Sequence, residues 1–118
     1  MNRHNFKKLQ FWHLSMDVVD DIYSLTRYFP KEEIFGLTHQ LRKSAISIPS
    51  NISEGCGRGT DLQLLQFTDI AQGSAYELET QVYITQRRKY CPDNEVEAVL
   101  SKISSVQKMI DGFQDNFR

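Results

Sequence analysis

The chain has 118 residues, of which 14 are Lys or Arg and 15 are Asp or Glu, and its net charge at pH 7 is −1. This length predicts one domain with a core large enough to fold without metal or disulfide staples. The near-zero charge excludes a strongly basic domain that attracts nucleic acid over its whole surface, but it permits local basic patches. Two cysteines do not form a disulfide framework, and no run is apolar enough to span a membrane or act as a signal peptide. We therefore expect a cytoplasmic protein with reduced thiols and no membrane partner.

The first predicted helix covers residues 10–28. Apolar side chains recur at steps of three and four residues, which is the spacing of one helical face. Pro30 ends this helix, because the residue before a proline is pushed out of the helical region. The apolar positions are Phe11, Leu14, Val18, Ile22, Leu25 and Phe29.

The second predicted helix covers residues 32–55, with acidic residues at its start, where the helix dipole favours them. The run Gly55-Cys56-Gly57 is expected to end it, with glycine available for a left-handed cap. Its expected buried face consists of Ile34, Leu37, Leu41, Ala45, Ile48 and Ile52.

The third and fourth predicted helices cover residues 61–89 and 94–113. Thr60 or Asp61 is expected to cap the third helix, and Asp93 or Asn94 the fourth, after the break at Pro92. The expected core positions of the two helices are Leu64, Phe67, Ala71, Ser74, Leu78, Val82, Thr85, Val96, Val99, Leu100, Ile103, Val106, Ile110 and Phe113.

Short connections between long helices make neighbouring helices antiparallel. The sequence thus predicts an all-α fold, an up-down-up-down antiparallel four-helix bundle formed as a single domain by residues 1–118. Cys56 and Cys91 would then lie at opposite ends of the third helix, roughly 40 Å apart at 1.5 Å per residue. That separation argues against a disulfide bond between them.

Pro49 lies inside the second predicted helix. Its ring removes the hydrogen bond to the Ala45 carbonyl, so we expect a bend at this point. Four small polar side chains surround the proline and could supply replacement hydrogen bonds, namely Ser44, Ser47, Ser50 and Asn51.

The first and third helices carry more apolar surface than one core-facing stripe requires. Surplus aromatic and aliphatic side chains often mark an interface, and symmetric self-association is its commonest form. The alternative is that these side chains only widen the core face. The candidate oligomer interface consists of Trp12, Met16, Val19 and Tyr23 on the first helix and Tyr76 and Tyr83 on the third.

No catalytic centre or cofactor site is predicted. A metal pair in a helical bundle needs Glu-x-x-His motifs, and none of the three histidines has a Glu three residues before it. Cys56 has no base nearby to activate it, and Gly55 to Gly59 lacks the Lys and Ser/Thr of a phosphate-binding loop. Glu54 and Glu77 are read as structural pins, with an acid/base pair as the alternative.

Basic residues gather toward both ends of the predicted bundle. They are compatible with phosphate contacts, and the alternative is a solvated surface in which the third helix's last turn complements its own dipole. The candidate nucleic-acid-binding residues are Arg3, Lys7, Lys8 and Arg58 toward one end and Arg87, Arg88 and Lys89 toward the other.

Three runs carry a resemblance to a known family: Gly36-Leu37-Thr38-x-Gln40-Leu41-Arg42-x-Ser44, Ser47-Ile48-Pro49-Ser50-Asn51-Ile52-x-Glu54-Gly55 and Gly57-Arg58-Gly59. Phe67, Ala71, Gly73-Ser74 and Glu77 to Gln81 extend the resemblance into the third helix. The sequence resembles the ribosomal-RNA intervening-sequence proteins, also called the four-helix bundle protein family. The signature positions are Gln40, Arg42, Pro49, Asn51, Glu54, Gly55, Gly57 and Glu77.

The resemblance implies a bacterial cytoplasmic four-helix bundle without enzymatic activity, often assembled as a homopentameric ring. Some members are encoded in insertions within large-subunit ribosomal RNA genes, and related retroelement accessory proteins bind nucleic acid and a reverse transcriptase. This chain departs from the pattern at Cys56, where an aromatic residue is usual, and at Asp69 to Gln72, where a basic residue often occurs.

The expected function is therefore that of a non-enzymatic homo-oligomer that binds or scaffolds RNA or a ribonucleoprotein partner. The alternatives are an assembly module that binds only protein and, with less support, an enzyme for a small ligand.

Overall fold

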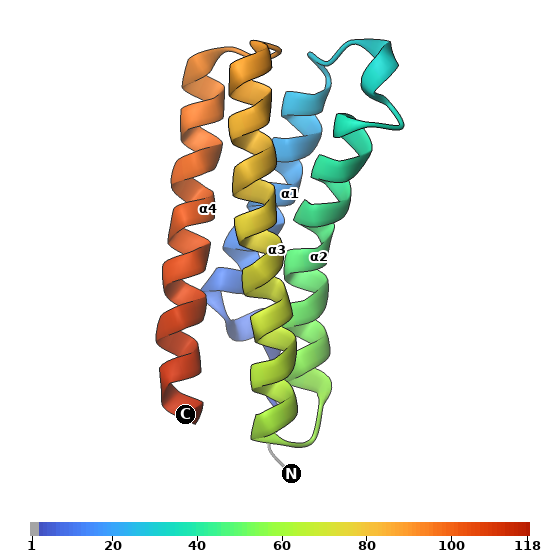
Figure 1. Ribbon diagram of the computed structural model, residues 1–118. Helices are drawn as coiled ribbons and strands as arrows, with labels where there is room; N and C mark the ends of the chain where they lie inside the picture. Colours follow the sequence, from blue (N-terminus) through green and yellow to red (C-terminus); the bar gives the residue numbers. More distant parts are fainter. Residues whose placement is uncertain (1–2) are drawn as a thin grey trace.

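The computed structural model describes residues 3–118 and contains four long helices and no strand within that range. Figure 1 shows α1 and α3 running in one direction and α2 and α4 in the other, which confirms the all-α, antiparallel four-helix bundle. The helices are α1 (Gln10–Thr26), α2 (Leu37–Gly57), α3 (Asp61–Arg88) and α4 (Asp93–Gln114), with short 3-10 turns at Phe6–Lys8, Lys31–Glu33 and Asp115–Phe117.

Each helix contacts the next along the chain, and α1 also contacts α4, so the four form a closed square around one core. The predicted stripes supply most of that core, because the apolar positions of each helix face the same axis. None of the helices described is long and apolar enough to cross a lipid bilayer. The largest fully buried side chains are Ile22, Leu41, Ile48, Ile52, Leu64, Leu78, Ile103 and Ile110.

The closest helix pair is α2 and α3, which share the most extensive contact in the bundle. A ladder of small polar side chains joins them. Ser44 Oγ donates a hydrogen bond to Glu77 Oε1 at 2.7 Å, and the hydroxyls of Ser47 and Ser74 are 2.8 Å apart. These bonds fix how far one helix can slide along the other, which is a structural use for polar groups in a helix seam.

The start of the second helix differs from the prediction. The chain makes a 3-10 turn at Lys31–Glu33, and α2 begins only at Leu37. Gly36 has φ −106° and ψ −114°, outside the helical region, and the Glu33 carboxylate accepts a hydrogen bond from the Leu37 amide at 3.2 Å. Because Gly36 interrupts the helical register, Ile34 is 56% exposed, and its assignment to the buried face was wrong.

The end of α2 also differs from the prediction. The helix continues to Gly57, and no glycine in residues 3–118 has a positive φ, so the predicted left-handed glycine cap is wrong. Gly55 has another role, since a Cβ added to it would lie 3.0 Å from Cβ of Phe67 and 3.3 Å from the carbonyl oxygen of Leu64. Gly55 therefore allows α2 and α3 to approach closely.

The caps of the last two helices agree only in part with the prediction. Thr60 caps α3 as expected, because its Oγ1 accepts a hydrogen bond from the Gln63 amide at 3.2 Å. The residue before α4 is Pro92, which has no capping side chain, so Asp93 is helical and the cap predicted at Asp93 or Asn94 is wrong. Acidic side chains in the first turn of α4 still complement its dipole.

The residue that ends α3 is Lys89, the single non-glycine residue with positive φ (57°) in the described part of the chain. Replacing Lys89 by glycine is expected to raise the free energy of unfolding by roughly 0.5–1 kcal/mol, because glycine adopts this left-handed conformation without steric cost. Urea denaturation measures the change. Lys89→Ala is the control, since alanine keeps the Cβ and removes the charge. Equal stability of the two variants would contradict the backbone explanation.

Pro49 is buried within α2, which remains helical on both sides of it. The predicted local replacement hydrogen bonds are present only in part. Asn51 Nδ2 donates to the Ser47 carbonyl at 2.8 Å and to Ser47 Oγ at 3.0 Å, and the hydroxyls of Ser44 and Ser47 also bond to side chains of α3. Ser44 therefore belongs to the seam between two helices, and Ser47 belongs both to that seam and to the local hydrogen bonds near the proline.

Candidate functional site

An apolar groove runs along the outer seam between α1 and α2 and has a volume of about 240 Å³. It contains three of the predicted interface residues, of which Trp12 and Val19 are partly buried and also pack against the core. Met16 is 40% exposed within it. The groove is lined by Trp12, Met16, Val19, Ile46, Pro49, Ser50 and Ser53.

Tyr23 continues the stripe above the groove, but it also has a structural contact. The guanidinium of Arg42 lies 4.4 Å from the centre of the Tyr23 ring and donates two hydrogen bonds to Thr26 Oγ1, at 2.9 and 3.1 Å. Arg42 therefore joins α2 to the end of α1. Gln40, one of the positions on which the sequence resemblance rests, is exposed one turn from the start of α2.

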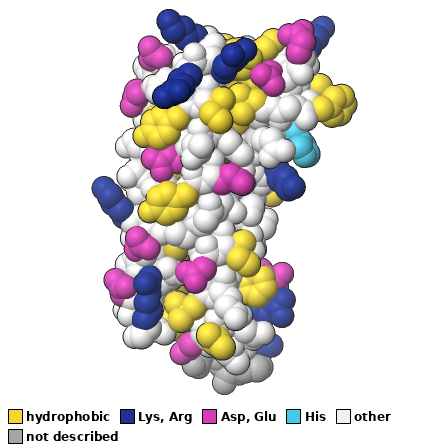
Figure 2. Space-filling view, viewed as in Figure 1, with side chains coloured by type: hydrophobic (Ala, Val, Ile, Leu, Met, Phe, Trp, Pro, Cys, Tyr) yellow, Lys and Arg dark blue, Asp and Glu magenta, His cyan; other side chains and the backbone are white. Residues whose placement is uncertain are grey.

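The other two predicted interface residues, Tyr76 and Tyr83, lie on α3 and are 53% and 47% exposed. Figure 2 shows hydrophobic side chains along the face formed by α3, away from the α1–α2 seam. A shallow pocket of about 440 Å³ lies at the upper end of this face, lined by Thr80, Tyr83, Ile84, Gln86 and Arg87. The predicted interface residues thus form two apolar surfaces on different sides of the bundle.

The predicted basic residues lie at the two ends of the bundle. The lower end, as drawn in Figure 1, contains the α2–α3 connection, and the upper end contains the α3–α4 connection. At the lower end Arg3 Nε donates to the Gly57 carbonyl at 3.0 Å, next to Arg58, and Lys7 and Lys8 belong to the first 3-10 turn. At the upper end Arg87 and Arg88 form the last turn of α3 and Lys89 follows. Because α3 has 28 residues, the two groups are about 40 Å apart.

Each end has an arginine engaged by other side chains, and at the upper end Arg88 lies over the Tyr90 ring, 5.8 Å from its centre. Arg58 pairs with Glu54 at 3.4 Å and stacks on Phe67, 4.8 Å from the ring centre. The ion pairs found within residues 3–118 involve Arg58, Lys102 and Arg118, and therefore none of the three basic residues that end α3. In Figure 2 Lys and Arg side chains gather around this upper end, among acidic ones.

The two glutamates considered as an acid/base pair are not close together. Glu77 accepts from Ser44 in the middle of the seam, whereas Glu54 pairs with Arg58 beside the Gly55–Phe67 contact. Ten residues of α3 separate Phe67 from Glu77, which corresponds to roughly 15 Å along the helix. The geometry favours the structural reading of both side chains.

The two cysteines are free and buried. Burial raises the pKa of each thiol to about 11, so neither is a thiolate at neutral pH. Cys91 donates a weak hydrogen bond to the Leu25 carbonyl at 3.3 Å. Among the described residues there is also no group of three or more His, Cys, Asp or Glu side chains able to hold a metal ion.

The sequence matches the family of 23S rRNA-intervening sequence proteins over residues 7–112. The chain belongs to this family. A crystal structure of a protein of unknown function from the S23 ribosomal protein family of Bacteroides thetaiotaomicron has the same fold, with a TM-score of 0.81 and 19% identity over 88% of this chain and 97% of that one. A comparison with curated proteins gave no match. Ser44, Ser47 and Glu77, which belong to the runs that carry the sequence resemblance, form the ladder where α2 meets α3.

One surface feature of this intervening-sequence protein was missed from the sequence. Phe35 is 91% exposed and Ile34 is 56% exposed, and together they form an apolar tip before α2. The signal was available, because Phe35 lies off the apolar stripe of the predicted helix and precedes a glycine. We call Ile34 and Phe35 the tip from here on.

Proposed function

We propose that this protein is a cytoplasmic, non-enzymatic homo-oligomer that binds RNA through the basic end of α3. Membership of the 23S rRNA-intervening sequence family supports a connection with ribosomal RNA. The observation that carries the proposal is the exposed basic run Arg87-Arg88-Lys89, which takes no part in the ion pairs found among residues 3–118.

Phosphate binding requires cationic side chains that are not already neutralised by acidic neighbours. Arg87 and Lys89 at the upper end meet this requirement, as do Lys7 and Lys8 at the lower end, whereas Arg58 is paired with Glu54 and Arg88 lies beside Tyr90 and Glu33. A single copy with a net charge of −1 offers only a few such contacts. Several copies in one assembly would repeat the basic run and add weak contacts into one multivalent surface.

Self-association is supported by the two apolar surfaces. The α1–α2 groove and the exposed tyrosines of α3 leave more hydrophobic area in water than a monomeric bundle requires. Because the groove and the tyrosines lie on different sides, a two-fold axis would not place the groove of one copy against the tyrosines of the other. A head-to-tail arrangement places them together, and it forms a closed ring when successive rotations between copies add up to a full turn.

Replacing two upper basic residues, in Arg88→Gln/Lys89→Gln, is expected to weaken binding to 23S ribosomal RNA fragments and to flatten its dependence on salt. Each lost phosphate contact lowers the slope of log K against log salt by roughly 0.7 to 1. Fluorescence anisotropy from 50 to 300 mM salt measures the slope. Arg87 is left in place because it lines the α3 pocket.

The matched control is Lys7→Gln/Lys8→Gln, which removes the same charge from the lower end and should leave the slope near that of the unsubstituted protein. Equal losses in the two variants would mean that net charge, and not the α3 end, governs binding. The absence of RNA binding at low salt, together with a stable oligomer, would overturn the RNA proposal and favour an assembly module that binds only protein.

A further inference from the structure

The tip is an apolar projection held in a defined position. The Glu33 carboxylate accepts two hydrogen bonds, from the Leu37 amide at 3.2 Å and from the Tyr90 hydroxyl at 2.9 Å. The Gly36 amide donates to the Glu33 carbonyl at 2.9 Å. A side chain at position 36 would place its Cβ 2.8 Å from Glu33 Oε1, so the glycine leaves room for this clamp.

An exposed phenylalanine on an ordered turn resembles the anchor residues of protein interfaces. Such anchors bind well when their conformation is fixed in advance, because little conformational entropy is lost on association. Both hydrogen bonds to the Glu33 carboxylate favour its charged form and lower its pKa, the Leu37 amide having the larger effect. The clamp is therefore intact at neutral pH.

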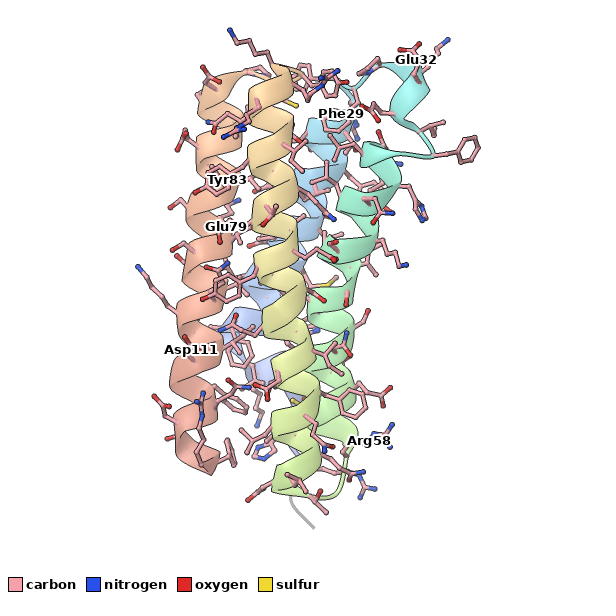
Figure 3. The ribbon with its side chains drawn as sticks, viewed as in Figure 1. Phe29, Glu32, Arg58, Glu79, Tyr83 and Asp111 are labelled. Carbon is pink, nitrogen blue, oxygen red and sulfur yellow. The ribbon has the colours of Figure 1, made fainter. Side chains whose placement is uncertain are left out.

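The α3 pocket provides a matching surface elsewhere on the same chain. It is shallow, with a volume of about 440 Å³, and the Tyr83 ring and Ile84 form its apolar walls. In Figure 3 Tyr83 and Glu32, which precedes the tip, are at the same end of the bundle but toward opposite sides. Phe35 does not fill the pocket of its own chain, since 91% of it is exposed.

The tip and the pocket lie within the same upper section of the bundle. The Glu33–Tyr90 hydrogen bond and the Ser44–Glu77 hydrogen bond mark two levels at which the α2 side of the molecule meets the α3 side. Along the chain, the tip lies between Glu33 and Ser44. The pocket, at positions 80–87, lies between Glu77 and Tyr90. A rotation about an axis parallel to the helices preserves height, so it places the tip of one copy level with the section of the next copy that contains the pocket.

The charges beside the two features are opposite. Glu32 is exposed next to the tip, and Arg87 is exposed in the wall of the pocket. When the tip of one copy approaches the pocket of another, these side chains come close and attract each other. Opposite charges at the edge of an apolar contact favour one orientation over others.

We propose that the Ile34–Phe35 tip of one copy inserts into the Thr80–Arg87 pocket of a second copy. The contact is heterologous, because each copy donates a tip on one side and a pocket on the other. This inference rests on the homo-oligomer of the proposed function, keeps the α3 face through Tyr83, and places the tip against that face in place of the α1–α2 groove. It leaves Arg88 and Lys89 outside the pocket lining.

Two single variants, Phe35→Ser and Tyr83→Ser, test the contact. Each is expected to shift the protein from its assembled form toward the 13.7 kDa monomer, with a dissociation constant raised roughly 30-fold or more, as for an interface anchor. Light scattering after size exclusion measures the mass at several micromolar concentrations. Circular dichroism checks that both variants remain helical, which we expect because both side chains are exposed.

Mixing the two variants separates a heterologous contact from a symmetric one. Phe35→Ser keeps its pocket and Tyr83→Ser keeps its tip, so the mixture should form a one-to-one dimer and no larger species. Leu62→Ser is the control, because Leu62 is 67% exposed but lies at the other end of α3. It should assemble like the unsubstituted protein.

Charge exchange gives an independent readout. Glu32→Arg and Arg87→Glu should each weaken assembly, and the double variant should restore it. If the unsubstituted protein assembles and Phe35→Ser assembles equally well, the tip-in-pocket contact is wrong, but the proposed homo-oligomer is still supported. An unsubstituted protein that is monomeric at micromolar concentration overturns both.

Discussion

Replacement of Gly55 by valine is expected to lower the free energy of unfolding by about 3 kcal/mol, which corresponds to a decrease of roughly 10 °C in Tm. The added Cβ would lie 3.0 Å from Cβ of Phe67 and 3.3 Å from the Leu64 carbonyl oxygen. Neither atom can move without a shift of the α3 backbone, so α2 and α3 must separate. The better helix propensity of valine offsets only a few tenths of a kcal/mol of that cost.

Gly57→Val is the matched control, because it places the same side chain in the last turn of the same helix with no atom within 4 Å of its Cβ. Its stability should remain within about 0.5 kcal/mol of the unsubstituted protein. Thermal and urea denaturation at one fixed protein concentration measure both variants. Similar stabilities for the two variants would show that the close approach at Gly55 is not required.

A rise in pH from 7 to 10 is expected to destabilise the fold by roughly 2–3 kcal/mol through Cys56 and Cys91 together. Burial raises the pKa of each thiol to about 11 in the folded protein, with a smaller contribution from Glu95 at Cys91. In the unfolded chain the thiols ionise near pH 9. Between these values the unfolded chain releases protons that the folded protein retains, so stability falls as the pH rises from about 9 to 11.

The double variant Cys56→Ala/Cys91→Ala provides the comparison. The quantity to compare is the loss of stability between pH 7 and pH 10 within each protein, measured by urea denaturation. Tyr28 and Lys102 also have raised pKa values, but they are present in both proteins. The variant should therefore lose less stability than the unsubstituted protein. Equal losses would show that the thiols do not govern the alkaline limit.

Much of the fold could be predicted because its information is local. Apolar residues at steps of three and four define one buried face per helix. Pro30 and Pro92 interrupt the helices whatever residues pack around them. The errors arise where a residue's role depends on a contact across the bundle. The local sequence predicts that Gly55 ends a helix, because its close approach to Phe67 exists only when α2 and α3 are packed together.

The candidate surfaces could be predicted in composition but not in arrangement. The second stripe of α1 was recognised from its periodicity, and Met16 and Val19 do line a groove. That this stripe and Tyr83 lie on different sides depends on how the helices surround the core. Phe35 is absent from the predicted surfaces because the sequence pattern predicts a helix that continues through Gly36, whereas a tertiary hydrogen bond from Tyr90 to Glu33 helps to hold the actual turn.

Both described ends of the chain lie at the lower end of the bundle. The His4 amide donates to the Cys56 carbonyl at 3.1 Å, and the His4 ring lies 5.4 Å from that of Phe117. The tip and Arg88 are at the opposite end of a molecule 47 Å long. Copies placed side by side at equal height would therefore form a single layer with two different faces. Every terminus would lie on one face and every basic run on the other. A dye attached at either terminus would report which face an RNA approaches without obstructing it.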